Sequence, residues 1–562
     1  MTPENVPQKR FGEIALCLSG GGYRAATYAL GTLDLLDELD LLADVKLLST
    51  VSGGTFTGVS YAVSQSEGTT FGAFYERFST FLKNTNCIDN ALKDLYDTPS
   101  PSGSTDLSLI RSAAKSYSAC LFGTRTFKQL LDIAGADARF KELIFNATEF
   151  REGNSFRFRA SWDKTTFIGN QNFAVPREVA DEVSLADIVA SSSCFPGAFE
   201  PFRFPDDFRW QSSLDTIRGK LVADVVEPFP PHGTYENGFN GGGKCIPLPL
   251  MDGGVFDNQG IASAILADNK NNFGLFLVSD TSQRDNDILN MPDACPRRGW
   301  VSLETLFWIA VALFVLSLVA IGVIAYSFFY TGGAMHFAPW QIIVGYIISI
   351  LPAFLLIGVL AWIYSLFLKA KTVVIADAKF RLWHYFKNMA LPDAIEIVKT
   401  RVNSVMALTT NIFMKRIRQL QFNNLLNAES RARLVSFNLI YTLNIIDGRE
   451  WLWNLDPELK PTGDMQKIAT VAEEMPTTLW MTGEQFKILV ACGRASTCFS
   501  LLKYLWQKWD TEEKAAKKHN PPAEVPKPND PASDYYEIYT RLKAKWLELK
   551  ENPFGSQNRE RV

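Results

Sequence analysis

Residues 14–26 read Ile-Ala-Leu-Cys-Leu-Ser-Gly-Gly-Gly-Tyr-Arg-Ala-Ala. The apolar residues at the start predict a short buried strand, and the leucines between Leu30 and Leu39 repeat at nearly helical spacing. A strand, a glycine turn and a helix in this order predict an α/β fold. Taken alone, the glycine spacing also fits a dinucleotide-binding loop, with Asp44 as the acid that would bind the ribose.

A second strand with a serine at its end favours a different chemistry. Residues 45–51 form an apolar run, and Ser52-Gly53-Gly54 then leads into a segment that can form a helix. A serine at a sharp turn from strand to helix is the arrangement of a nucleophile elbow, where the helix N-terminus favours an oxyanion. Ser52 is therefore the predicted nucleophile, and the alternative is an ordinary turn serine.

The first glycine turn is predicted to contribute to the same site as Ser52. Gly20, Gly21 and Gly22 lie at the equivalent position of the neighbouring strand, so we expect their backbone N–H groups to form an oxyanion hole. Arg24 either adds a fixed positive charge behind these amides or forms a structural salt bridge. The structural alternative for the glycines is a simple tight turn.

Four motifs in order resemble the patatin-like phospholipase family. They are SGGGYRA from Ser19, TVSGGT around Ser52, SSSCFPGAFEPF from Ser191 to Phe202, and MDGGVFDN from Met251 to Asn258. The similarity covers about residues 11–290, with a weaker echo in helices between 371 and about 504. It implies a three-layer α/β sandwich with a central, mainly parallel sheet.

The resemblance also implies a Ser-Asp dyad in which Asp252 takes the proton of Ser52. Asp257, in the same loop, is the rival base, and Asp252 could instead only stabilise its turn. Two positions depart from the family pattern: Thr50 replaces the usual elbow glycine, and Ala25 stands where glycine is more common. Neither departure removes a reacting atom.

Two long apolar segments predict a transmembrane helical hairpin. Residues 306–330 and 338–368 contain no charged residue, and the first alone would form a helix about 37 Å long, more than the hydrocarbon core of a bilayer. Arg297 and Arg298 precede the pair, whereas Lys369 and Lys371 follow it, which predicts that both ends are cytoplasmic. Two buried core helices of a soluble protein are the alternative.

These features divide the chain into five predicted parts. They are a catalytic domain at 1–296, the hairpin at 300–368, a helical region at 371–506 that completes or packs on the catalytic domain, a linker at 507–532, and an amphipathic helix at 533–551. The N-terminus lacks an apolar signal segment, so we expect a cytoplasmic catalytic domain. The last helix would dock on its own domain, on a second copy or on a partner protein.

Composition excludes several other classes. The chain has 562 residues, of which 47% are hydrophobic and 21% charged, and a formal net charge of -4. So small a charge argues against a nucleic-acid-binding surface. The eight cysteines form no CxxC pair and the four histidines show no metal-binding spacing, so we expect neither a metal nor a cofactor.

The sequence therefore predicts a membrane-anchored serine acyl hydrolase acting on glycerophospholipids or related acyl lipids. Hydrolysis would pass through an acyl-enzyme on Ser52. An acyltransferase with the same site is the close alternative, and a catalytically silent membrane scaffold is the alternative from another class.

Overall fold

The computed structural model describes residues 11–97, 108–135, 138–161, 167–170, 174–223, 247–284, 301–330, 358, 389–408, 412–427, 434–518 and 524–555. The chain divides into two compact units: Met1–Asn286 together with Phe413–Val562 form unit 1, and Asp287–Ile412 form unit 2. Unit 2 is thus an insertion in the sequence of unit 1.

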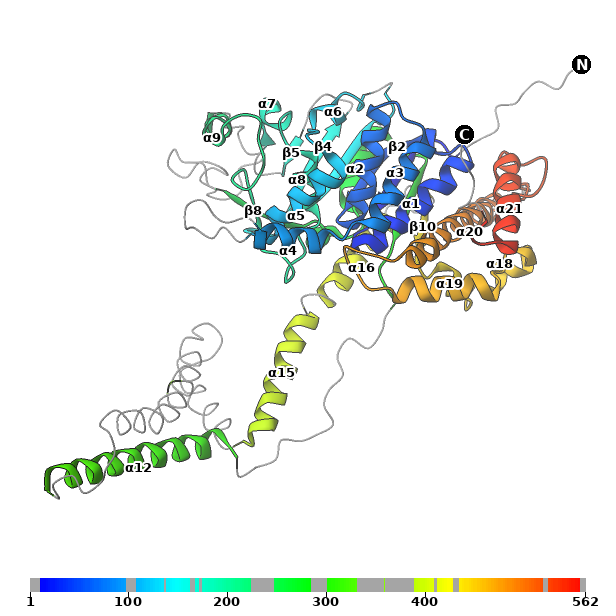
Figure 1. Cartoon of the computed structure of the whole chain (residues 1–562). Helices are drawn as coiled ribbons and strands as arrows, with labels where there is room; N and C mark the ends of the chain where they lie inside the picture. The colour runs from blue at the N-terminus through cyan, green and yellow to red at the C-terminus, as the bar shows by residue number, and fades with distance from the viewer. Residues whose placement is uncertain are drawn as a thin grey trace, which may run out of the picture. The chain divides into compact units, whose positions relative to one another are not determined.

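The described helices and strands of unit 1 alternate in the way that the glycine turns predict (Figure 1). In chain order they are β1 (Ile14–Leu18), α1 (Gly22–Glu38), β2 (Val45–Val51), α2 (Gly53–Ser66), α3 (Phe71–Asn84), α4 (Cys87–Asp97), α5 (Leu109–Tyr117), α6 (Lys128–Leu131), β3 (Glu142–Glu149), β4 (Asn154–Ser161), β5 (Phe167–Gly169), β6 (Ala174–Val175), α7 (Arg177–Ala180), α8 (Leu185–Ser192), β7 (Phe202–Phe204), α9 (Leu214–Ala223), β8 (Leu248–Asp252), α10 (Gly254–Asp257), α11 (Ile261–Asn271), β9 (Leu275–Asp280), α16 (Phe413–Leu426), β10 (Val435–Leu439), α18 (Glu450–Leu455), α19 (Gly463–Glu474), α20 (Gly483–Ala516) and α21 (Tyr536–Glu551).

One mixed sheet organises unit 1. Its order is β10-β9-β1-β2-β3-β4-β5-β6, and β8 joins it by pairing with both β3 and β7. The neighbours from β10 to β3 are all parallel, whereas β4, β5, β6, β7 and β8 pair antiparallel. The predicted parallel sheet is therefore correct for the half that carries the glycine turns.

Alternate residues of the central strands face two separate cores. In β1, Leu16 and Leu18 belong to the large core under α1 and α2, whereas Ala15 and Cys17 belong to a smaller core. Residues of α11 and α16 complete the smaller core. Because side chains alternate across a strand, helices cover both faces of the sheet, as the three-layer expectation requires.

The segment after unit 2 completes the sheet. β10 pairs in parallel with β9, from Val435 opposite Phe276 to Leu439 opposite Asp280. α20 packs along α1, and Gly31 and Gly493 meet at that contact because a Cβ on either would collide with the other helix's backbone. α20 continues to Ala516, so it includes the first ten residues of the segment predicted as a linker. α21 packs on α20 with Trp546 fully buried.

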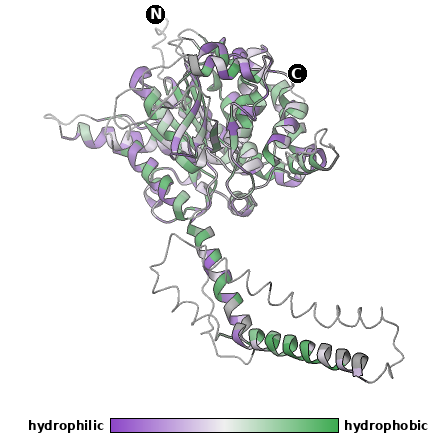
Figure 2. Ribbon diagram, turned by 90° about the vertical axis from the view of Figure 1, so that its left-hand side faces the viewer, coloured by the Kyte–Doolittle hydropathy of each residue, from purple (hydrophilic) through white to green (hydrophobic). Residues whose placement is uncertain are grey.

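Unit 2 contains two described helices, α12 (Leu303–Tyr330) and α15 (Leu391–Ala407). α12 covers the first predicted span, and Figure 2 shows the hydrophobic colouring of its described residues. Large apolar side chains are exposed over much of it, among them the consecutive Phe307, Trp308 and Ile309, whereas Ala310 and Ser317, one helical stripe, are buried. The predicted turn at 331–337 and all of the second span except Gly358 lie outside the described residues, so no hairpin is shown.

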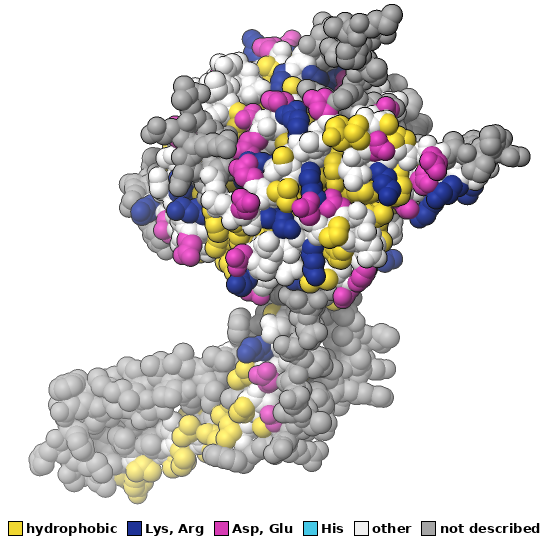
Figure 3. Space-filling view, turned by 90° about the vertical axis from the view of Figure 1, so that its right-hand side faces the viewer, with side chains coloured by type: hydrophobic (Ala, Val, Ile, Leu, Met, Phe, Trp, Pro, Cys, Tyr) yellow, Lys and Arg dark blue, Asp and Glu magenta, His cyan; other side chains and the backbone are white. Residues whose placement is uncertain are grey.

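Among the described residues, one helix is long and apolar enough to cross a membrane, and it is α20. The most apolar stretch of α20 is 89% buried within the structure, as expected for a core helix of unit 1. Within α12, residues 304–319 form a shorter apolar helix. In Figure 3 hydrophobic side chains predominate over the described part of unit 2, beside a few charged ones, and the visible face of unit 1 mixes hydrophobic, acidic and basic side chains.

Candidate active site

Ser52 lies at the sharp turn between β2 and α2. Its backbone has φ 49° and ψ −116°, and it occupies the N-cap position of α2. A positive φ is rare for a residue with a Cβ, and such strain persists only where the surrounding structure holds it. The side chain is at the positive end of a helix of 14 residues. This is the predicted elbow geometry.

Glycines allow the two turns to approach each other closely. A Cβ on Gly53 would collide with the backbone of Gly22, and a Cβ on Gly54 would lie 2.5 Å from the carbonyl oxygen of Leu18. A Cβ on Gly20 would lie 3.1 Å from the Cβ of Ser52. The first glycine turn therefore packs directly against the serine.

The amides of this turn are not equivalent. The Gly20 N–H donates to the carbonyl of Asn258 at 2.9 Å, and its carbonyl accepts from the Thr281 hydroxyl at 3.0 Å. Within the described residues, the N–H groups of Gly21 and Gly22 donate to no protein acceptor. The turn thus has two unused amide donors where three were predicted, since the Gly20 amide holds the loop in place.

Asp252 ends β8, and its carboxyl lies near enough to the Ser52 hydroxyl for that hydroxyl to lower its pKa. The carboxyl accepts a hydrogen bond from the Gly254 N–H at 2.7 Å. Both side chains are nearly buried, at 7% exposure for Ser52 and 4% for Asp252. Burial raises the pKa of the Asp252 carboxyl to about 6, while the Ser52 hydroxyl and the Gly254 amide act in the opposite direction. A carboxylate of this basicity beside a serine hydroxyl suits a general base.

The carboxyl of the rival base, Asp257, already binds loop amides. Its two oxygens accept from the N–H groups of Gln259 at 3.1 Å and Ala262 at 2.7 Å. These bonds satisfy the start of α11, where free N–H groups need acceptors. Burial raises the pKa of Asp257 to about 6 as well. The pKa therefore does not distinguish the two acids, but proximity to the Ser52 hydroxyl does, since that hydroxyl acts on the pKa of Asp252 and not on that of Asp257.

Arg24 is buried and holds a distant segment onto α1. Its guanidinium donates to the carbonyl oxygens of Met475 at 2.6 Å and Glu473 at 3.3 Å. Burial lowers its pKa, against the opposing effect of Asp280 and Glu473. Of the two interpretations that the sequence allowed, these contacts favour the structural one.

Ser192, which the sequence did not single out, holds the backbone of the Ser52 turn through hydrogen bonds. The Ser192 hydroxyl accepts the Ser52 N–H at 2.9 Å and donates to the Asn146 carbonyl at 2.6 Å. The Ser192 carbonyl accepts the Gly253 N–H at 3.2 Å, beside Asp252. Ser192 therefore ties the nucleophile strand to the loop of the base. The pattern SSSCFPGAFEPF contained it, but no feature of that pattern distinguishes Ser192 from its neighbours.

Thr50 fits the elbow because Gly58 leaves room for it. A Cβ on Gly58 would lie 2.5 Å from the Thr50 methyl group. The Thr50 hydroxyl is 3.0 Å from that of Thr55, which is 2.8 Å from the Ser192 hydroxyl. The departure from the family pattern thus belongs to the hydrogen-bond network that holds Ser52. All four histidines, at 232, 336, 384 and 519, lie outside the described residues.

Fold and site together define an α/β protein with a strained serine at a strand-to-helix turn and a buried carboxyl beside it. Residues 16–265 match the family model described as patatin-like phospholipase. Over these residues the chain carries a patatin-like phospholipase domain. The matched residues include the end of β1, the elbow and Asp252.

The other two comparisons add little. No curated protein matches the chain. Among solved structures, human GIVD cytosolic phospholipase A2 is similar at 12% sequence identity with a TM-score of 0.29. That match covers 48% of this chain and 45% of the other, so this chain spans less than half the length of the structure it matches.

Proposed function

We propose that the protein is a serine acyl hydrolase that uses Ser52 and Asp252 on glycerophospholipids or related acyl lipids. The observation that carries this proposal is the position of the Asp252 carboxyl beside the hydroxyl of Ser52 at a strained elbow. The family match supports the choice of a lipid ester as substrate.

In this mechanism the Ser52 oxygen attacks the ester carbonyl while Asp252 accepts the hydroxyl proton. The N–H groups of Gly21 and Gly22 would donate to the oxyanion, and a donor of this kind contributes about 2.7–4 kcal/mol in measured enzymes. The alcohol leaves with the proton from Asp252, and water activated by Asp252 then cleaves the acyl-enzyme. Arg24 would act only by fixing the start of α1.

Labelling by a fluorophosphonate tests the nucleophile. The purified full-length protein should be labelled, and Ser52→Ala should abolish both labelling and release of fatty acid from a phospholipid panel. Ser60→Ala is a matched control, since Ser60 is buried in the same helix, α2, at 2% exposure. Labelling that persists in Ser52→Ala would exclude this nucleophile. Acyl transfer to an added alcohol at the expense of hydrolysis would favour the acyltransferase alternative.

We further propose that α12 anchors the enzyme in a bilayer, as one span of the predicted hairpin. Exposure of many large apolar side chains on one helix is unfavourable in water and favourable in lipid. Tethering would raise the local concentration of lipid at the site. The protein should stay in the membrane fraction after alkaline carbonate washing. Replacing Trp308, Leu316 and Val319 of α12 by Lys should release it, whereas release of the unmodified protein would exclude the anchor.

A further inference from the structure

The side chain of Asn258 lies between the two turns that form the candidate active site. A Cβ on Gly20 would lie 2.4 Å from the Asn258 Oδ1 and 3.1 Å from the Cβ of Ser52. A Cβ on Gly254 would lie 2.6 Å from the same Oδ1 and 3.0 Å from Oδ1 of Asp252. The carboxamide is therefore close to both the proposed nucleophile and the proposed base.

This carboxamide carries donors that no described residue uses. The Asn258 side chain is half-buried, and among the described residues it has no hydrogen-bond partner. Its Oδ1 packs against Gly20 and Gly254, whose C–H groups are weak donors. The nitrogen at the other end of the carboxamide has two N–H donors. These donors are available to a ligand in the site.

The main chain of Asn258 takes up one of the three amides that the sequence predicts for the oxyanion hole. The Gly20 N–H donates to the Asn258 carbonyl at 2.9 Å. The Arg24 guanidinium, which the sequence also suggested for this role, binds the carbonyls of residues 473 and 475. Of the predicted groups, the amides of Gly21 and Gly22 thus remain for an oxyanion.

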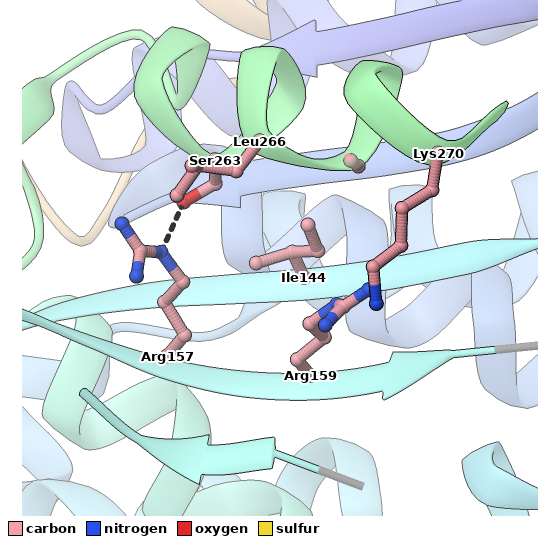
Figure 4. Close-up of a pocket in the computed structure, with 7 residues that line it drawn as sticks. Ile144, Arg157, Arg159, Ser263, Leu266 and Lys270 are labelled. Carbon is pink, nitrogen blue, oxygen red and sulfur yellow. Dashed lines mark hydrogen bonds between the residues drawn. The ribbon is translucent and has the colours of Figure 1, made fainter. Parts of the chain in front are cut away.

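The segment around Asn258 is held in place from both sides. The Asp257 carboxyl accepts from two backbone N–H groups at the start of α11. In Figure 4, Arg157 of β4 points to Ser263 in the first turn of α11, to which it donates at 2.7 Å. Ser263 in turn donates to the Asn146 side chain at 2.6 Å. A donor that is already fixed needs no reorganisation when charge develops in the transition state.

We infer that Asn258 donates from Nδ2 to the oxyanion, as a third donor beside the amides of Gly21 and Gly22. This inference rests on the proposed function. As the Ser52 oxygen forms its bond to the ester carbon, its proton passes to Asp252 and the carbonyl π electrons move to the carbonyl oxygen. Asparagine side chains act as donors to such oxyanions in other enzymes, where removal of one donor lowers kcat about a hundredfold to a thousandfold.

The test uses the full-length protein in neutral detergent, a soluble short-chain ester and a trifluoromethyl ketone with the same acyl chain. The Ser52 oxygen bonds to the ketone carbon, its proton passes to Asp252, and the ketone oxygen becomes an oxyanion. The ketone has no leaving alcohol, so its Ki does not depend on a contact with the alcohol. Asn258→Leu keeps the branched shape without the donor, and Asn258→Ala replaces it if Asn258→Leu does not fold. Both variants keep the backbone carbonyl that binds Gly20.

We expect kcat of Asn258→Leu to fall about a hundredfold or more with little change in KM, and Ki of the ketone to rise by a similar factor. The thiono analogue of the ester should be slowed much less, because sulfur is a weak hydrogen-bond acceptor. Asn272→Gly is the control. It removes a carboxamide from an exposed residue at the end of α11, where a φ of 57° suits glycine, and should leave kcat and Ki unchanged.

Three results would overturn the inference. Unchanged kcat in both Asn258 variants would exclude any contact with the reacting ester. A fall in kcat with an unchanged Ki would place the carboxamide on the leaving alcohol instead. An equal loss for the ester and its thiono analogue would indicate a displaced Ser52. If the unmodified protein neither hydrolyses the ester nor binds the ketone, the proposed function itself fails, and that result is distinct from the other three.

Discussion

The Asp252 carboxyl lies beside the Ser52 hydroxyl because β2 and β8 pair with adjoining stretches of the same edge of β3. The register of the sheet explains this contact. Val51 of β2 pairs with Asn146 of β3, and Asp252 of β8 pairs with the adjacent Ala147. A serine and an aspartate from opposite ends of the domain's sequence therefore emerge at the same level of the sheet, where the proposed proton transfer takes place.

The first prediction concerns the acid limb of activity. Because burial raises the pKa of Asp252 to about 6, the base is ionised above that pH and protonated below it. The value of kcat/KM should therefore fall about tenfold per pH unit below about pH 6. Rates on a soluble short-chain ester between pH 4.5 and 8 measure this limb.

Asp257→Asn provides the control, because Asp257 has a similarly raised pKa. The midpoint of the acid limb should stay near pH 6 in this variant, even if the rate changes. Loss of the limb in Asp257→Asn would transfer the role of base to that residue.

The second prediction is that removing the proposed base stabilises the fold at neutral pH. The folded-state pKa of Asp252 is above its ordinary value of 3.8, so the folded state holds the proton more tightly than the unfolded state. That contribution to stability is complete below about pH 3.8 and is lost as the pH rises through about 6. Asp252→Asn cannot ionise and should be more stable at pH 7.5, by about 1–3 kcal/mol.

Thermal unfolding in detergent at pH 7.5 and at pH 4 measures this difference. The advantage of Asp252→Asn over the wild type should shrink as the pH falls, while its hydrolysis stays absent at both values. A gain in Tm that is equal at both values would mean that the charge of Asp252 is not its origin.

The parts of the site that sequence predicts are those that lie within one local pattern. The strained turn at Ser52 and the glycines at 20–22 each occupy a single strand-turn-helix unit, so spacing alone indicates their arrangement. Asp252 was assigned through the family resemblance, since nothing local distinguishes it from Asp257. Its position beside Ser52 depends on the register of β3 with two other strands.

Other features depend on contacts between distant segments, which spacing does not encode. Arg24 looks like part of the oxyanion turn in sequence, yet its contacts are with residues 473–475. The Gly20 amide is used by Asn258, and Ser192 is one of three consecutive serines. β10 follows the whole of unit 2 before it pairs with β9, so the extent of the sheet could not be read from the first domain.

The third prediction concerns Ser192 as a positioning residue. Ser192→Ala removes the acceptor of the Ser52 N–H and the donor to Asn146, so it leaves a buried amide and a buried carbonyl unsatisfied. We expect kcat to fall about tenfold to a hundredfold, because a small displacement of a nucleophile is costly. KM and the acid-limb midpoint near pH 6 should not change.

Ser191→Ala is the matched control, since the Ser191 hydroxyl donates only to the Asp187 carbonyl within α8. Its kcat should stay within about twofold of the wild type, because the lost hydrogen bond lies within α8 and does not involve the nucleophile or the proposed base. If Ser192→Ala lowers Tm but leaves kcat of the folded enzyme intact, Ser192 has a structural role only.

The fourth prediction tests the pairing of Thr50 with Gly58. Gly58→Ala would place its Cβ 2.5 Å from the Thr50 methyl group, so it should destabilise the protein by about 1–3 kcal/mol and slow fluorophosphonate labelling of Ser52. Thr50→Ser removes that methyl group but keeps the hydroxyl that contacts Thr55. The double variant Thr50→Ser/Gly58→Ala lacks this collision, so its Tm and labelling rate should return most of the way from the Gly58→Ala values to those of the wild type.

If the changes in Tm and labelling rate of the double variant equal the sum of those of the single variants, the two residues are not coupled. Coupling would explain why this chain retains a working elbow geometry with threonine where its family usually has glycine, because the helix that follows Ser52 provides the space that the strand before it uses.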